Sequence, residues 1–276
     1  MSITYESTSR TVQLPGGEVH YNEAGEGQPI VFLHGSGPGA TGWSNFGPNI
    51  LELSKKFRCL ALDAPGWGKS YPVKATERNH PAVVAQFLDA LGIEKAALVG
   101  NSMGGATTLR FGVEYPDRIS HLITMGAGGG GVKLFGAGDG PTEGLKILIE
   151  GYRDPSPETM RRLVDIMSYN SGDASEALAI ERSENAKANQ VHLDNFLGGV
   201  GAGRLWPSEE ELAGIATPSL LFHGRDDRVV HYENGLKLVA LIPNSRLVLF
   251  NRCGHWAQIE HAAEFNAMVA QFMESN

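Results

Sequence analysis

Short apolar runs alternate with amphipathic helical patterns over most of this 276-residue chain. Several of the runs end in glycine, as buried parallel strands often do. Strands are expected at 29–35, 57–63, 96–100, 118–126, 218–224 and 245–250, and helices at 48–55, 80–92, 104–115, 233–241 and 258–273. An N-terminal hairpin is expected within 11–22. The alternation predicts an α/β fold in which helices flank a mostly parallel central sheet, joined by right-handed crossovers.

The alternation stops between residues 133 and 207, where helical patterns occur without a convincing strand. Ser156 followed by Pro157 marks one helix start, because serine caps and proline suits the first helical position. A helical insertion into a parallel sheet is typical of a lid over the strand ends, where ligands bind. We predict a core domain of residues 1–132 and 208–276 and a helical lid subdomain of residues 133–207.

The composition excludes some classes of protein. The chain is 42% apolar and 20% charged, with a formal net charge of −8, whereas nucleic-acid binders present a basic face. No apolar run approaches the ~18 residues of a membrane span, and the polar N-terminus lacks a secretory signal pattern. Cys59 and Cys253 form neither a disulfide framework nor a metal-binding pattern, so a cytoplasmic location is expected.

The strongest chemical signal is the sequence Gly100-Asn101-Ser102-Met103-Gly104. It lies between an expected strand and an expected helix, the context in which a G-x-S-x-G turn presents a nucleophilic serine. The helix N-terminus also favours negative charge that develops nearby. We predict Ser102 to be a nucleophile; the alternative is a helix-capping serine in a glycine-rich turn.

A serine nucleophile needs a base and a group that orients the base, and in this architecture they follow in the order acid, then histidine. Two late strands end in suitable residues, at Asp226-Asp227 and at His255. We predict His255 as the base and Asp227 as the orienting acid, with Asp226 as its competitor. Turn or capping aspartates and a buried structural histidine are the alternatives.

A histidine- and glycine-rich segment, His34 to Ala40, follows the first expected parallel strand. Such a segment supplies one oxyanion donor, and the residue after the nucleophile supplies the other. We predict the backbone N–H groups of Ser36 and Met103 as these donors.

The same segment also fits a dinucleotide-binding fingerprint, with Asp63 about 20 residues on as a ribose-binding acid. Pro38 argues against it, because proline removes an N–H from the loop that should hold a pyrophosphate. Among other candidates, Cys253, His34, His223 and His261 are interpreted as structural residues. Arg182 has two interpretations, a solvated helix arginine or a bidentate partner for a substrate carboxylate.

Several segments together resemble the α/β-hydrolase superfamily, and within it the meta-cleavage product hydrolases of aromatic degradation. They are HGSGPGATGWSNF (34–46), DAPGWGKS (63–70), LVGNSMGG (98–105), PTEG (141–144), GRDDRVV (224–230), GLKL (235–238) and CGHWAQIEHAAEFN (253–266). The resemblance implies an α/β-hydrolase fold with an inserted helical lid, a Ser102-His255-Asp227 triad and oxyanion donors at Ser36 and Met103. It also implies that Asn45, Asn101, Arg182 and Trp256 contact the substrate.

The resemblance further implies hydrolysis of a carbon–carbon bond in 2-hydroxy-6-oxo-hexa-2,4-dienoates, without a metal or organic cofactor. The products would be a 2-hydroxypenta-2,4-dienoate and a carboxylic acid. The expected partner is the small-molecule dienoate, with no nucleic acid or membrane, and a homodimer or larger homo-oligomer is implied. Two other functions stay open at this point: a carboxylesterase with the same triad, and a non-catalytic ligand receptor on a hydrolase scaffold.

Overall fold

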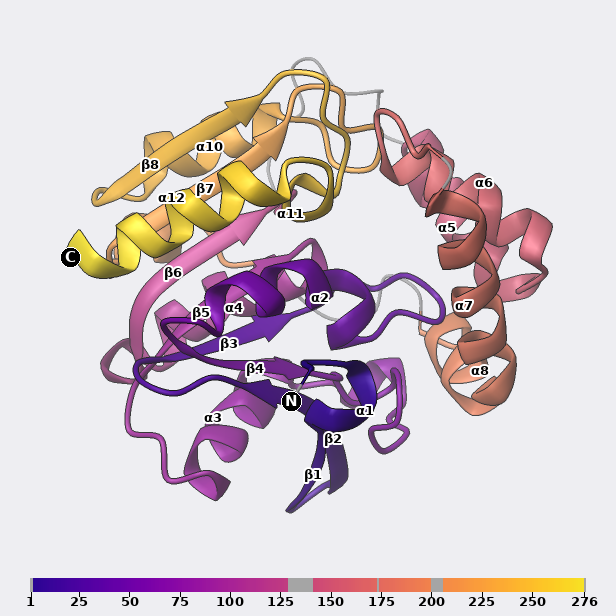
Figure 1. Ribbon diagram of the computed structural model, residues 1–276. Helices are drawn as coiled ribbons and strands as arrows, with labels where there is room; N and C mark the ends of the chain where they lie inside the picture. The colour runs from indigo at the N-terminus through magenta and orange to yellow at the C-terminus, as the bar shows by residue number, and fades with distance from the viewer. Residues whose placement is uncertain (1, 129–140, 173, 200–205, 276) are drawn as a thin grey trace.

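The computed structural model describes residues 2–128, 141–172, 174–199 and 206–275. A single eight-stranded sheet in the order β1-β2-β4-β3-β5-β6-β7-β8 forms its centre (Figure 1). The strands are β1 (Ser9–Leu14), β2 (Gly17–Ala24), β3 (Pro29–Leu33), β4 (Arg58–Leu62), β5 (Ala96–Asn101), β6 (Ile119–Met125), β7 (Ser219–Gly224) and β8 (Ser245–Phe250). Strands β3 to β8 pair in parallel and the β1–β2 hairpin joins β4 antiparallel, which confirms the predicted fold class.

Helices cover both faces of the sheet because the central strands are apolar on both faces. In β3, Val31 and Leu33 join the apolar cluster on one face, whereas Ile30 and Phe32 join the cluster on the other. The first cluster includes α3 (His80–Ala90), α4 (Met103–Glu114) and α10 (Glu233–Leu241). The second includes α2 (Gly42–Leu53) and α12 (Ala262–Ser275). The shorter helices of the core are α1 (Tyr5–Thr8), η1 (Ala75–Glu77), η2 (Pro116–Arg118), α9 (Glu209–Ala213) and α11 (Ala257–Glu260).

Two predicted helices differ from those observed. Helix α2 begins at Gly42 rather than at Pro48, because Thr41 and Ser44 form a capping box at its start. The predicted helix 258–273 is two helices, α11 and α12, separated at His261. There the backbone leaves the helical region, and the imidazole stacks on Phe250 with centroids 4.7 Å apart.

Four further helices lie beyond the carboxyl ends of the strands, as Figure 1 shows at the right of the molecule. They are α5 (Glu143–Arg153), α6 (Pro157–Met167), α7 (Ala174–Ala188) and α8 (Gln190–Leu197). No strand occurs among described residues 141–172 and 174–199, and we call these four helices the lid. The lid packs around its own apolar cluster, which also includes Val229 and Trp256 of the core. The predicted boundary at 132–133 lies outside the described residues and stays a prediction.

Among the described residues, no helix combines the length and the apolar character that a bilayer crossing requires.

Candidate active site

Ser102 lies at the sharp turn between β5 and α4. It is one of two non-glycine residues in the described chain with a positive φ, at φ 53° and ψ −112°. A Cβ at Gly100 would lie 2.2 Å from the Gly104 carbonyl oxygen, and one at Gly104 would lie 1.9 Å from the Leu33 carbonyl oxygen. Only glycine fits at both places, so the sequence dictates a strained turn that holds Ser102 above the sheet.

The structure brings His255 and Asp227 together from the loops that follow β8 and β7. The His255 Nδ1 atom lies 2.8 Å from Asp227 Oδ2, and both side chains are buried. The other carboxylate oxygen of Asp227 accepts hydrogen bonds from the backbone N–H groups of Val229 and Val230. Asp226, the predicted competitor, instead faces Arg225 at the surface.

The electrostatics keep the Asp227 carboxylate charged. Burial alone would raise the pKa of this carboxyl, but His255 and His223 outweigh burial and hold the pKa well below its usual range. His223 Nε2 lies 3.3 Å from Asp227 Oδ2 and 2.8 Å from the carbonyl oxygen of Val230. These contacts suit the His255 imidazole, which can accept a proton at Nε2 while the Asp227 carboxylate holds its Nδ1.

The segment after β3 wraps around the Ser102 turn. Its first residue, His34, accepts a hydrogen bond at Nε2 from the backbone N–H of Ala64, and burial lowers the pKa of its imidazole. The Gly35 N–H donates to Asn45 Oδ1, and a Cβ at Gly35 would lie 3.4 Å from Ser102 Cβ. Met103, the first residue of α4, follows Ser102 directly, so its N–H has no partner within the helix.

Arg182 reaches this place from lid helix α7 and is only 1% exposed. Its guanidinium lies over the indole of Trp256, 4.9 Å from the ring centroid. Burial lowers the pKa of this guanidinium to about 10, so it stays charged at neutral pH. Its Nε atom has no hydrogen-bond partner among the described residues. A buried cation with unused donors is a natural partner for a carboxylate.

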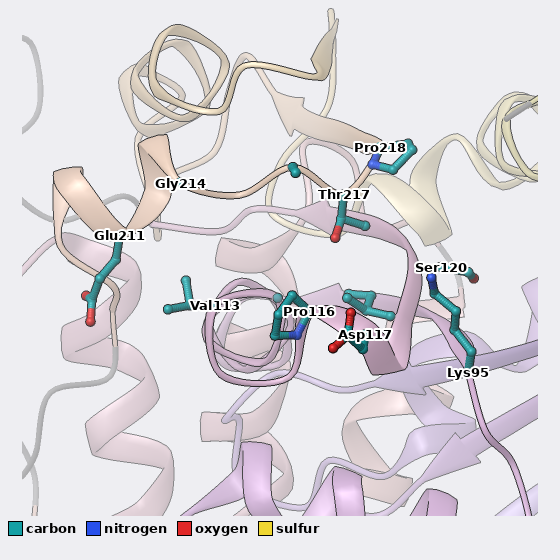
Figure 2. A pocket seen from close by; sticks show the side chains of 12 residues that line it. Lys95, Val113, Pro116, Asp117, Ser120, Glu211, Gly214, Thr217 and Pro218 are labelled. Atoms are coloured by element: carbon teal, nitrogen blue, oxygen red, sulfur yellow. The ribbon is translucent and has the colours of Figure 1, made fainter.

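One small pocket joins most of the predicted site residues. Ser102, His255 and Arg182 line it together with Gly35, Ser36, Gly37, Asn45, Asn101, Leu148, Met167 and Trp256. Asp227 lies behind His255, outside the lining. The Ser102 hydroxyl makes no hydrogen bond to His255 or to any other described residue, although both side chains face this pocket. A wider groove near Pro116 and Thr217 lies at the opposite ends of the strands, away from these residues (Figure 2).

Residues 28–262 match the alpha/beta hydrolase fold family. The chain belongs to the α/β-hydrolase fold family. A 2-hydroxy-6-oxononadienedioate/2-hydroxy-6-oxononatrienedioate hydrolase of Cupriavidus pinatubonensis is 42% identical, over 99% of this chain and 97% of that protein. A 2-hydroxy-6-oxo-6-phenylhexa-2,4-dienoate hydrolase of Comamonas testosteroni is 44% identical, over 92% of this chain and 91% of that protein. Among solved structures, a meta-cleavage product hydrolase of Pseudomonas fluorescens IP01 is 32% identical, with a TM-score of 0.87 over 97% of this chain and 98% of that chain. These relatives confirm the resemblance that the motifs predict.

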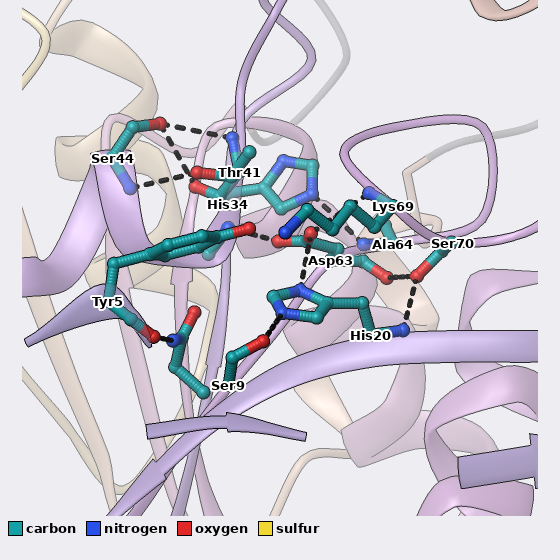
Figure 3. Close-up of polar contacts among 12 residues, drawn as sticks. Tyr5, Ser9, His20, His34, Thr41, Ser44, Asp63, Ala64, Lys69 and Ser70 are labelled. Carbon is teal, nitrogen blue, oxygen red and sulfur yellow. Dashed lines mark hydrogen bonds and ion pairs between the residues drawn. The ribbon is translucent and has the colours of Figure 1, made fainter. Parts of the chain in front are cut away.

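The dinucleotide interpretation is wrong for this family member. The Asp63 carboxylate is fully buried and already receives hydrogen bonds from the backbone N–H groups of Gly42 and Lys69. It also lies 2.8 Å from His20 Nδ1 (Figure 3). A carboxylate occupied in this way has no free oxygen to offer a ribose.

Two contacts between the lid and the site were not predicted from the sequence. The backbone carbonyl of Met167 accepts a 2.6 Å hydrogen bond from the His255 N–H, and the Tyr152 hydroxyl donates a 2.6 Å hydrogen bond to the Ser36 carbonyl oxygen. Neither residue belongs to a recognisable motif. Their roles depend on how the lid helices lie against the core, which no local pattern encodes.

The described residues contain no group of three or more His, Cys, Asp or Glu side chains suited to a metal ion. Cys59 and Cys253 are free and buried, and burial raises the pKa of the Cys59 thiol to about 12. Burial raises the pKa of Cys253 as well. Both thiols therefore stay protonated at neutral pH, which disfavours either cysteine as a nucleophile.

Proposed function

We propose that this chain hydrolyses the C5–C6 bond of 2-hydroxy-6-oxo-hexa-2,4-dienoates, with Ser102, His255 and Asp227 as the catalytic triad. The observation that carries the proposal is the buried Arg182 guanidinium, which lines the same pocket as Ser102 and His255. An ester hydrolase has no need of a buried cation there, whereas a dienoate has a carboxylate to pair with it. The names of the similar hydrolases support the same substrate class.

The first stage is a tautomerisation. The C2 hydroxyl loses its proton and C5 gains one, which gives a 2,6-dioxo form with a C3–C4 double bond. His255 carries the proton, and Asp227 stabilises the imidazolium that forms. Arg182 holds the C1 carboxylate, and Asn45, Asn101 and Trp256 are the other proposed contacts with this end of the substrate. The C2 carbonyl can then accept the electron pair that is released when C5–C6 breaks.

The second stage is attack on the C6 carbonyl, by Ser102 Oγ or by a water molecule that Ser102 assists. The oxygen of C6 becomes negative and accepts hydrogen bonds from the N–H groups of Ser36 and Met103. The C5–C6 bond then breaks, and its electron pair moves through C3–C4 to the C2 oxygen. Protonation gives 2-hydroxypenta-2,4-dienoate, and one water molecule is consumed to release the acid from C6.

A panel of dienoates with phenyl, alkyl and carboxyalkyl groups at C6 tests this proposal. The expected result is loss of the yellow absorbance of at least one dienoate, with kcat/KM above that for p-nitrophenyl acetate. Arg182→Gln should raise KM for the dienoate and leave ester hydrolysis nearly unchanged. High activity on esters with none on any dienoate would favour the carboxylesterase. Tight dienoate binding without turnover would favour the ligand receptor.

We also propose a cytoplasmic location and a homodimer or larger homo-oligomer. The two free thiols support a reducing compartment. The edge strand β8 supports association, because Leu249 on it is 41% exposed. Light scattering across a concentration series tests the oligomer, and a mass of 29.6 kDa at every concentration would contradict it.

A further inference from the structure

Tyr152 joins the lid to the loop after β3. It lies in α5 and is only 2% exposed, and its hydroxyl makes two hydrogen bonds. The hydroxyl donates to the Ser36 carbonyl oxygen at 2.6 Å and accepts from Trp67 Nε1 at 2.9 Å. Burial raises the pKa of this phenol, so the hydroxyl keeps its proton and remains a donor.

The ring of Tyr152 is held independently of its hydroxyl. It stacks on Phe196 of α8, with centroids 3.8 Å apart and ring planes 4° apart. The Arg78 guanidinium in turn lies over both Phe196 and Trp67, 5.3 and 4.5 Å from their ring centroids. Removal of the hydroxyl alone should therefore leave the ring and the packing of the lid in place.

The residue that receives this hydrogen bond is flanked by two glycines. Gly35 and Gly37 have no Cβ to restrict their φ and ψ angles. The peptide that joins Gly35 to Ser36 carries the Ser36 N–H, and its carbonyl oxygen lies 2.7 Å from His34 Nδ1. The Ser36 N–H is the proposed oxyanion donor, and its direction depends both on this peptide and on the position of the Ser36 Cα, to which the peptides on either side are joined. The Ser36 carbonyl belongs to the next peptide, and there the Tyr152 hydroxyl holds the other side of the residue.

We infer that Tyr152 is a positioning residue for the oxyanion hole, so that the Ser36 N–H is directed correctly only when the lid is seated. This inference rests on the proposed function, because it assigns Ser36 to the C6 oxyanion. A second contact agrees with it: the Met167 carbonyl in the lid holds the His255 backbone N–H. The lid thus contacts the backbones of both loops that flank Ser102.

The test is Tyr152→Phe, followed by stopped flow with a dienoate that the wild type turns over. Loss of an oxyanion donor lowers rates by about 10²–10³. A misdirected donor retains part of its effect, and we expect the cleavage phase to slow by about tenfold. The tautomerisation phase and KM should stay within twofold, because Arg182 and His255 are untouched. A merely structural role would slow both phases together. Tyr115→Phe is the matched control, because Tyr115 stacks on Phe111 in the core and should leave both phases unchanged.

The same variant is measured on p-nitrophenyl acetate, which needs the oxyanion hole but no dienoate chemistry. A tenfold loss there, with no dienoate turned over by the wild type, would retain the role of Tyr152 and reject the C–C hydrolase. Unchanged kinetics, or equal slowing of both phases, overturns the role of Tyr152 whatever the substrate. Should Tyr152→Phe fail to fold, Trp67→Phe removes the donor that fixes the hydroxyl. It must slow only the cleavage phase, by a smaller factor, or the inference fails.

Discussion

Two sets of a serine, a histidine and an aspartate lie near the carboxyl ends of the strands, and only one of them has the surroundings of an active site. In the first set, Ser9 Oγ lies 2.7 Å from His20 Nε2, and His20 Nδ1 lies 2.8 Å from Asp63 Oδ2 (Figure 3). The second set is Ser102, His255 and Asp227. By hydrogen bonds alone, the first set is the better connected of the two.

The surroundings of the two serines differ in backbone, helix and pocket. Ser102 has a strained positive φ at the start of α4 and shares a pocket with Arg182. Ser9 begins β1 with ordinary extended angles, and its hydroxyl is already hydrogen-bonded. The Asp63 carboxylate links β2 to the start of α2 and to the Lys69 loop. A serine, a histidine and an aspartate within hydrogen-bond distance therefore do not by themselves make a nucleophile, and we expect the Ser9 set to contribute to stability instead.

The largest expected effect is a difference in kcat between variants of Ser102 and Ser9. Ser102→Ala should lower kcat for the dienoate by about 10³–10⁶-fold, because it removes the proposed nucleophile. Ser9→Ala should leave kcat within about twofold. Steady-state loss of dienoate absorbance measures both, and circular dichroism checks that both variants fold. Wild-type turnover by Ser102→Ala, or an inactive Ser9→Ala variant, would contradict the assignment of Ser102 as the nucleophile.

The next largest effect is a difference in kcat between variants of the adjacent residues Asp227 and Asp226. Asp227→Asn should lower kcat by about 10⁴-fold, because the amide no longer holds His255 in the tautomer that accepts the serine proton. Asp226→Asn is the matched control and should keep nearly full activity, since that carboxylate faces Arg225 at the surface. Similar losses in the two variants would mean that the His255–Asp227 contact has no catalytic role.

The sequence predicts the core of this fold well because its signals are local. The strand 245–250 and the helix 233–241 are observed with the predicted bounds, since apolar periodicity and flanking turns define them. The start of α2 is missed because the capping box of Thr41 uses Ser44 rather than the usual acid or amide, and because Pro48 lies inside the helix. Proline is tolerated there although it removes one helical N–H.

In the candidate site, too, the features encoded by local sequence were predicted and those that depend on long-range packing were not. The turn around Ser102 is encoded by adjacent glycines, and the order of the late strands limits the choices for its partners. Tyr152 and the Met167 carbonyl act through the packing of the lid against the core, so no local pattern reveals them. The His20–Asp63 pair joins β2 to the end of β4, and the spacing of Asp63 instead matched a nucleotide-binding pattern by chance. Long-range pairing of this kind needs coordinates.

A third effect tests the assignment of the Ser9 set to stability. Asp63→Asn should lower the free energy of unfolding by about 3 kcal/mol, because it breaks a buried, fully hydrogen-bonded pair with His20. Asp89→Asn is the control: Asp89 forms an ion pair with Arg118 but is 65% exposed, so its loss should cost less than about 1 kcal/mol. Urea unfolding measures both. Equal losses in the two variants would remove the structural role given to Asp63.

The smallest effect concerns His80, a buried histidine whose charged neighbours are Arg78 and His34 rather than a carboxylate. Burial, then Arg78 and His34, lower the pKa of His80 to about 3. The unfolded chain has an ordinary histidine pKa of about 6.5, so it binds more protons than the folded chain between these values. The His80 contribution should therefore reduce the free energy of unfolding by up to about 1.4 kcal/mol for each pH unit below about 6.5.

Urea unfolding of the wild type and of His80→Gln at pH 8, 7, 6 and 5 measures this. The difference between the two proteins should stay constant from pH 8 to 7 and change in favour of the variant below that. A constant difference down to pH 5 would contradict the lowered pKa of His80, because it would show that folding does not hinder protonation of this imidazole.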